Sequence, residues 1–295
     1  MQNRNAKSLP QTWDAASLGE VPTQDYSEVM ATEDGLYSWL STLNRVGIVI
    51  LKGAPKAEEE VIRLAQRVAE PYRTVYGRHF DVQPVQDPLN LAYSTLSIPL
   101  HQDILYYESS PGIQLLHCME FDSTLNGGSN YFVDSFRAAQ HLEEEHPEHY
   151  AFLASHPANW VKHDSLCDLV QRRTHIVLDA QKQLVGIHWS PPWEGVIELP
   201  PSQMKPYVAA YKALYDAINK EELRLEWRLQ PGEVATFNNR RILHSRHGFE
   251  GSGQRKLQGT YLTVDDTWST LRILQKKRQL STRDVYRSGG MGWAA

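Results

Sequence analysis

The apolar positions near the start of the chain alternate between helical and strand-like spacing. Residues 37–43 place Tyr37, Leu40 and Leu43 at helical intervals, and residues 46–53 form a short, strand-like apolar run. Residues 57–70 have apolar side chains on one helical face, which predicts an amphipathic helix. A helix, a buried strand and a second helix in succession indicate a sheet backed by helices.

The next part of the chain, residues 71–136, breaks into short segments separated by Pro, Gly and Asn, which predicts strands with long connections. Residues 125–129 form a Gly-containing turn between two expected strands, 113–121 and 130–136. Residues 137–155 and 203–222 have helical patterns, and short strands are expected between them and after them. The pattern predicts a mainly β protein with flanking helices, a double-stranded β-helix or jelly roll.

Residues 1–34 show little periodicity, and we expect an N-terminal arm that packs through Trp13. We place the main domain at 35–278, ending in a helix near 267–277, and a tail at 279–295. The length suits one large domain. The absence of a long apolar run excludes a transmembrane helix, and the N-terminus lacks an apolar signal core. We therefore expect a cytoplasmic protein.

The formal net charge of −5 gives no reason to expect nucleic acid as a partner. Two cysteines, Cys118 and Cys167, are too few for a disulfide framework or a cysteine zinc site. Cys118 lies in an apolar run and is expected to be buried.

Candidate chemistry begins at the triplet His101-Gln102-Asp103. On a strand, residues two apart point to the same side, so the imidazole and the carboxylate can converge on a metal. Such a triplet also occurs in proteins where it ligates nothing. A second histidine would complete the facial triad of two histidines and one carboxylate that suits Fe(II) oxygen chemistry. His244 and His247 both qualify, and we favour His244 because it ends an apolar strand, whereas His247 follows in a Gly-rich turn.

Activation of O2 needs two further electrons, and 2-oxoglutarate is the usual source. Its distal carboxylate requires a fixed cation, for which the planar fork of arginine is best suited. Arg255 lies eleven residues after His244, at the start of an expected strand. The alternative is a surface arginine on an edge strand.

Five motifs in order carry a family resemblance: LHQD, PGIQLLHC, GGSNYFVDSF, PGEVATFNNRRILHSR and RKLQGTYLTVDD. Together they resemble the γ-butyrobetaine and trimethyllysine dioxygenases of the TauD-like Fe(II)/2-oxoglutarate oxygenases, over residues 35–275. The resemblance implies a jelly roll with His101, Asp103 and His244 as iron ligands. It also implies that Arg255 and Asn90 contact 2-oxoglutarate. The small cysteine-containing zinc domain that usually precedes this catalytic domain is expected to be absent.

In γ-butyrobetaine dioxygenase an aromatic cage holds the trimethylammonium group through cation–π attraction. The matching positions here are Tyr76, Phe80, Tyr93 and Tyr261, for each of which core packing is the alternative. The pattern differs after Asp103, where Ile104 replaces a cage tyrosine and Tyr106 resembles the spacing of the trimethyllysine enzyme. It differs again at residues 186–195, where Trp189, Pro191, Pro192 and Trp193 replace an asparagine-rich loop and are expected to form a stiffer, more apolar wall.

The sequence therefore predicts an Fe(II)- and 2-oxoglutarate-dependent dioxygenase that uses O2 to oxidise a small amine or trimethylammonium substrate by hydroxylation, with release of succinate and CO2. One alternative keeps the iron site but ends in desaturation, cyclisation or C–C cleavage of an amino acid or specialised metabolite. Another is a non-catalytic jelly-roll binding protein. A homodimer is possible, and neither nucleic acid nor a membrane is expected as a partner.

Overall fold

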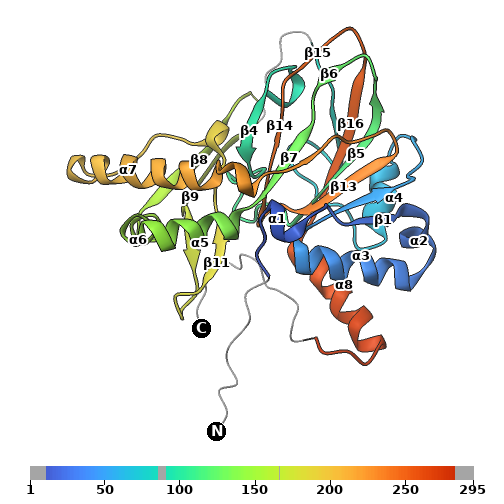
Figure 1. The fold of residues 1–295 in the computed structure, drawn as a ribbon, viewed down its shortest axis with the longest axis horizontal. Coiled ribbons are helices and arrows are strands. Elements are labelled where there is room, and N and C mark those ends of the chain that lie inside the picture. Colours follow the sequence, from blue (N-terminus) through green and yellow to red (C-terminus); the bar gives the residue numbers. More distant parts are fainter. Residues whose placement is uncertain (1–10, 86–90, 166, 283–295) are drawn as a thin grey trace.

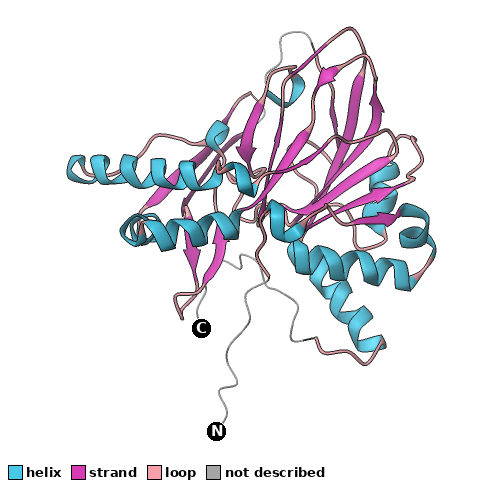
Figure 2. Ribbon diagram, in the orientation of Figure 1, coloured by secondary structure: helices cyan, strands magenta, loops and turns pink. Residues whose placement is uncertain are grey.

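Two antiparallel sheets face each other in the computed structural model, which describes residues 11–85, 91–165 and 167–282 (Figure 1, Figure 2). Apart from the parallel β1–β2 pair, all strand pairings in these sheets are antiparallel. The larger sheet has the order β1 (Thr23–Asp25), β2 (Ile48–Lys52), β13 (Glu233–Asn238), β5 (Ile113–Phe121), β16 (Arg255–Leu262) and β3 (Phe80–Val82). The smaller sheet has the order β12 (Leu225–Trp227), β7 (Asn130–Asp134), β14 (Ile242–Arg246) and β4 (Ile98–His101). The predicted jelly roll is confirmed.

Three two-stranded sheets complete the β structure. They are β8 (Pro157–His163) with β9 (Asp168–Thr174), β10 (Ile176–Leu178) with β11 (Leu184–Ile187), and β6 (Asn126–Gly127) with β15 (Phe249–Glu250). The β6–β15 pair extends the turn expected at residues 125–129.

Apolar side chains from both sheets fill the space between them. The rings of Phe132 on β7 and Phe237 on β13 lie 5.5 Å apart, and Ile242 on β14 joins the same cluster. These residues alternate along their strands with others that face outward, such as Leu243, which packs against helices. Alternation therefore assigns one face of each strand to the inner core and the other face to a helical layer.

Helices cover the outer faces of both sheets (Figure 1). The larger sheet packs against α3 (Glu33–Val46), α4 (Glu60–Gln66) and α8 (Val264–Lys277), beside α2 (Tyr26–Ala31). The smaller sheet packs against α5 (Ser135–Glu145), α6 (Pro147–Ser155) and α7 (Pro201–Ile218). The remaining helical segments are α1 (Ala15–Leu18) and the 3-10 turns η1 (Leu91–Tyr93), η2 (Pro191–Trp193) and η3 (Glu221–Leu223).

The helix expected at 137–155 is two helices, because Pro147 starts a new one. Proline has no N–H to donate to the preceding turn and is tolerated at the first helical position, which Pro147 occupies in α6. The helix expected at 57–70 is shorter and spans Glu60–Gln66.

Parts of residues 11–34 pack closely against the rest of the fold. Trp13 is buried as expected, and its Nε1 donates to the carbonyl of Val46 at 2.7 Å. Residues Thr23–Asp25, however, pair in parallel with Ile50–Lys52 and so belong to the larger sheet. Gly35 lies inside α3, so no structural boundary falls at that residue. A three-residue strand gives too little periodicity to be recognised from the sequence.

Cys118 is fully buried on β5, as predicted. Among the helices of the described residues, none has the length and apolar character needed to cross a membrane. Residues 283–295, which make up most of the expected tail, lie outside the described part of the chain.

Candidate metal centre

Three candidate ligands converge at one end of the smaller sheet. His101 is the last residue of β4, Asp103 lies in the turn that follows, and His244 is on β14 directly opposite His101. His101 Nε2 and His244 Nε2 lie 3.3 and 3.8 Å from Asp103 Oδ1. The three donor atoms all lie within 4.8 Å of one another. Octahedral ligands at about 2.1 Å from a metal are about 3 Å apart, so small adjustments would complete the site.

The protonation of these groups suits a cation. His101 Nδ1 lies 2.9 Å from the carbonyl of Pro99, which places its proton on Nδ1 and directs the Nε2 lone pair toward Asp103. Burial and the neighbouring His101 lower the pKa of His244 to about 3, so this imidazole is neutral. Burial opposes ionisation of Asp103, but its polar contacts with His101, His244 and Tyr261 outweigh burial and hold the pKa of Asp103 below its usual range. Two imidazoles and one carboxylate are a donor set that fits Fe(II).

Asp103 is held at both its side chain and its backbone. Tyr261 Oη donates to Asp103 Oδ2 at 2.7 Å, which leaves Oδ1 facing the two histidines. Asn239 Oδ1 accepts from the Asp103 N–H at 2.9 Å, and Asn239 Nδ2 donates to the Asp103 carbonyl at 3.0 Å. Ile104 then adopts a φ of +60°, a left-handed conformation that is rare for a β-branched residue. The candidate ligand Asp103 therefore lies in a strained turn that hydrogen bonds hold in place, and not on the strand itself.

Arg255, at the start of β16, is a buried cation between aromatic rings. Only 3% of the residue is exposed, and its guanidinium lies 5.2 Å from the ring centre of Phe121 and 5.6 Å from that of Phe249. Its Nε has no hydrogen-bond partner among the described residues, and burial lowers its pKa to about 10, so it stays charged at neutral pH. The alternative of a surface arginine on an edge strand is wrong, since β16 lies between β5 and β3.

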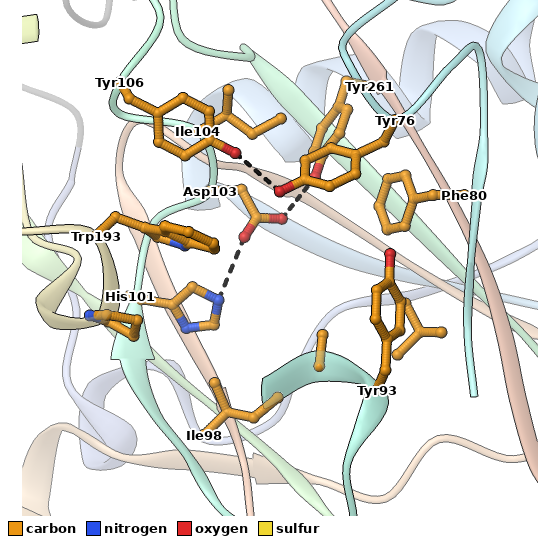
Figure 3. A pocket seen from close by; sticks show the side chains of 13 residues that line it. Tyr76, Phe80, Tyr93, Ile98, His101, Asp103, Ile104, Tyr106, Trp193 and Tyr261 are labelled. Atoms are coloured by element: carbon orange, nitrogen blue, oxygen red, sulfur yellow. Dashed lines mark hydrogen bonds and ion pairs between the residues drawn. The ribbon is translucent and has the colours of Figure 1, made fainter. Parts of the chain in front are cut away.

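An aromatic pocket opens beside the candidate ligands (Figure 3). It encloses about 570 Å³ of empty space, part of it open solvent. His101 and Asp103 line this pocket together with the four cage candidates proposed from the sequence, Tyr76, Phe80, Tyr93 and Tyr261, and with Ile104 and Tyr106. The Tyr76 and Tyr106 hydroxyls lie 3.0 Å apart, and the Phe80 ring stacks on Tyr261 at 5.1 Å.

Trp189 does not line this pocket, which corrects one expected substrate contact. Its side chain is 1% exposed and packs 4.8 Å from the ring of Tyr211 on α7. Its backbone instead bonds on both sides to Gln102, the residue between the two ligands. The 3-10 turn at Pro191–Trp193 carries Pro192 and Trp193 to the pocket wall in its place. The apolar wall expected from this loop is therefore present, but its tryptophan is Trp193 and not Trp189.

His247 lies apart from the three converging residues. Its side chain is 49% exposed and lies 4.0 Å from Glu226. Asn90, expected to contact 2-oxoglutarate, lies outside the described residues. Asn239 was not recognised from the sequence, although it stands in the quoted run NNRRILHSR. Its contact with Asp103 spans 136 positions, and no local pattern signals it.

A jelly roll with two histidines and a carboxylate beside a pocket defines the class of non-haem Fe(II) oxygenases. The chain belongs to the family described as "Taurine catabolism dioxygenase TauD, TfdA family", whose match covers residues 5–261. It is an Fe(II)- and 2-oxoglutarate-dependent oxygenase.

Among characterised proteins, the chain is similar to the γ-butyrobetaine dioxygenase of Homo sapiens, with 34% identity over 264 residues that cover 88% of this chain and 68% of that protein. The corresponding enzyme of Pseudomonas sp. (strain AK-1) is 32% identical, covering 87% and 67%. The mitochondrial trimethyllysine dioxygenase of Rattus norvegicus is 30% identical, covering 86% and 61%.

Solved structures support the fold. An asparagine oxygenase in complex with Fe(II), 3-hydroxyasparagine and succinate superposes with a TM-score of 0.63 at 15% identity, covering 91% of this chain and 99% of that one. A taurine dioxygenase from Burkholderia xenovorans gives a TM-score of 0.60 at 18% identity, covering 81% and 82%.

Proposed function

We propose that His101, Asp103 and His244 hold the Fe(II) of this oxygenase, and that a small amine or quaternary ammonium substrate is hydroxylated in the adjoining aromatic pocket. The observation that carries the proposal is that His101 and Asp103 line the same pocket as the aromatic side chains. When bound there, Fe(II) with 2-oxoglutarate and O2 supplies the oxidising power to insert one oxygen atom into a C–H bond, with succinate and CO2 as coproducts.

The chain itself positions the reactants. Tyr261 and Asn239 orient the Asp103 carboxylate, and His101 keeps its proton on Nδ1 so that Nε2 faces the metal position. Arg255 is the candidate partner for the distal carboxylate of 2-oxoglutarate, because a buried guanidinium with an unused donor favours a bidentate anion. The rings around the pocket exclude water and favour a cationic or apolar substrate. The γ-butyrobetaine and trimethyllysine dioxygenases among its relatives support a substrate of this class.

Residues that differ from the cage pattern favour a second outcome at the same site. Ile104 stands where a cage tyrosine was expected, and Trp193 narrows the opposite wall. A substrate held differently over the metal would be desaturated, cyclised or cleaved instead of hydroxylated. Product mass separates the outcomes, since hydroxylation adds one oxygen atom and desaturation removes two hydrogens.

A screen of amines and betaines for stimulated succinate release tests the proposal. We expect at least one quaternary ammonium or amine compound to raise succinate formation above the substrate-free rate in the presence of Fe(II). A non-catalytic binding protein would form no succinate with any compound. A cytoplasmic location, a homodimer, the 35–278 domain and a 2-oxoglutarate contact from Asn90 stay predictions.

A further inference from the structure

The residue that carries a further inference is Lys162, on β8. Ala158 and Trp160 on the same strand belong to the apolar cluster that surrounds Ile104, Tyr106 and Tyr261. Side chains two residues apart share a face of a strand, so Lys162 lies on the same face as these two residues. Its side chain is 11% exposed, which is unusual for a lysine.

The Lys162 ammonium lies over two aromatic rings at once. Its Nζ is 5.5 Å from the ring centre of Tyr76 and 5.0 Å from that of Trp193. Both rings line the pocket, and Figure 3 shows them on either side of Asp103. Lys162 also forms an ion pair with Asp164, with Nζ and Oδ2 2.5 Å apart. The protein therefore keeps its own cation at ring faces that a ligand cation would otherwise use.

A quaternary ammonium group cannot share these faces at low cost. Cation–π attraction requires the cation to lie within about 6 Å of the ring centre, and Lys162 already occupies that range for both rings. A second cation there would meet like charge in a partly desolvated site. Among the remaining cage candidates, the ring of Phe80 stacks on that of Tyr261, so each of these two rings already has one face covered.

An anion is favoured at the same place. An ammonium has three donors, of which the Asp164 carboxylate and the Tyr76 hydroxyl take two. A carboxylate of the substrate would gain a charge-assisted hydrogen bond from Lys162.

We propose that Lys162 determines the charge of the substrate end lying between Tyr76 and Trp193: it excludes a quaternary ammonium there and binds a carboxylate. The inference rests on the proposed function and deepens it. The substrate is then a zwitterion, an amino acid or a betaine, whose carboxylate points to Lys162 and whose ammonium lies elsewhere in the pocket.

Paired compounds that differ only in the carboxylate test the proposal. We would compare γ-butyrobetaine with butyltrimethylammonium, and 4-aminobutanoate with butylamine, by kcat/KM for succinate release. The wild-type protein should prefer the carboxylate-bearing member of an active pair by about tenfold or more, since one charge-assisted hydrogen bond is sufficient for that ratio. Lys162→Met should abolish the preference, and Lys162→Arg should retain it. Equal use of both members by the wild type, or an unchanged preference in Lys162→Met, would overturn the role of Lys162.

Lys52, on β2 of the larger sheet, provides a matched control, because its Nζ lies 5.2 Å from the ring centre of Trp227. Lys52→Met should leave the preference unchanged. If no compound in either series raises succinate formation, the proposed function fails, and a binding measurement still decides the role of Lys162. Titration with tetramethylammonium, followed by tryptophan fluorescence, should show about tenfold tighter binding to Lys162→Met than to the wild type. Equal binding would mean that Lys162 does not occupy the ring faces.

Discussion

At the scale of single residues, Asp103 shows how the candidate metal site is prepared before a metal binds. Its two carboxylate oxygens have different surroundings: Oδ2 accepts from Tyr261, and Oδ1 faces His101 and His244. Asn239 holds the backbone of Asp103 from both sides. A ligand constrained in this way loses little conformational entropy when it coordinates a metal, which favours tight binding.

Tyr261→Phe removes one of these constraints and keeps the aromatic ring. We expect the affinity for Fe(II), or for Mn(II) as a stable substitute, to fall by about 10- to 100-fold, because the freed carboxylate can rotate away from the histidines. Isothermal titration under anaerobic conditions measures this directly. Tyr76→Phe is the control, since its hydroxyl contacts Tyr106 and not Asp103. Equal metal affinity in Tyr261→Phe and the wild type would show that the hydrogen bond does not position the ligand.

Glu194, beside the pocket wall, makes a pH-dependent contribution to stability. Burial raises the pKa of its carboxyl to about 7, and a hydrogen bond from Tyr211 opposes the rise only in part. The folded state therefore holds a proton that the unfolded state releases near pH 4.5. Protein stability should fall as the pH rises from about 4.5 to 7, because the unfolded state binds fewer protons in that window.

Glu194→Gln isolates this effect, since the amide cannot ionise. Relative to the wild type, the variant should gain roughly 3 kcal/mol in unfolding free energy between pH 4.5 and pH 8, from 1.36 kcal/mol per pKa unit. Urea unfolding at the two pH values measures the change. A difference between the two proteins that does not vary with pH would contradict a raised pKa for Glu194.

At the scale of elements, local periodicity predicted individual helices and strands. It did not predict the contacts between segments that lie far apart in the sequence. Helical spacing located α3, α7 and α8, and His101 and His244 both lie on strands, as the sequence predicted. It could not show that β4 ends at His101, so that Asp103 lies in a turn.

The loop at residues 186–195 also shows that a local sequence pattern cannot predict which side chains reach the pocket. Two tryptophans there look alike in sequence, yet Trp189 packs under α7 while η2 turns Trp193 toward the pocket. Only the three-dimensional packing distinguishes them. Lys162 was missed for the same reason, because its aromatic neighbours lie far from it in the sequence.

At the scale of the whole molecule, Arg241 connects parts of the chain that lie far apart in sequence. It forms a buried ion pair with Asp134 on β7, at 2.8 Å, with side-chain exposures of 1% and 0%. The same guanidinium donates to the carbonyls of Arg45, in α3, and Gln11, near the N-terminus. One side chain thus joins the smaller sheet, a helix and the N-terminal segment.

Arg241→Ala should therefore destabilise the entire fold. It leaves the Asp134 carboxylate buried without its cation, a change that costs about 3–5 kcal/mol in unfolding free energy. Arg137→Ala is the control, since the Arg137–Asp14 pair is longer, at 3.9 Å, and more exposed, and should contribute less than about 1 kcal/mol. Urea unfolding followed by circular dichroism measures both. Similar losses in the two variants would mean that Arg241 has no special role in joining these elements.

The central claim is that His101, Asp103 and His244 together form the Fe(II) site of this oxygenase. Anaerobic titration of the metal-free protein with Fe(II), in the presence of 2-oxoglutarate, tests it most directly when the wild type is compared with His244→Ala. We predict one Fe(II) per chain in the wild type and at least 100-fold weaker binding in the variant, because one of only three protein ligands is lost. Binding of Fe(II) by His244→Ala with wild-type stoichiometry and affinity would contradict the account.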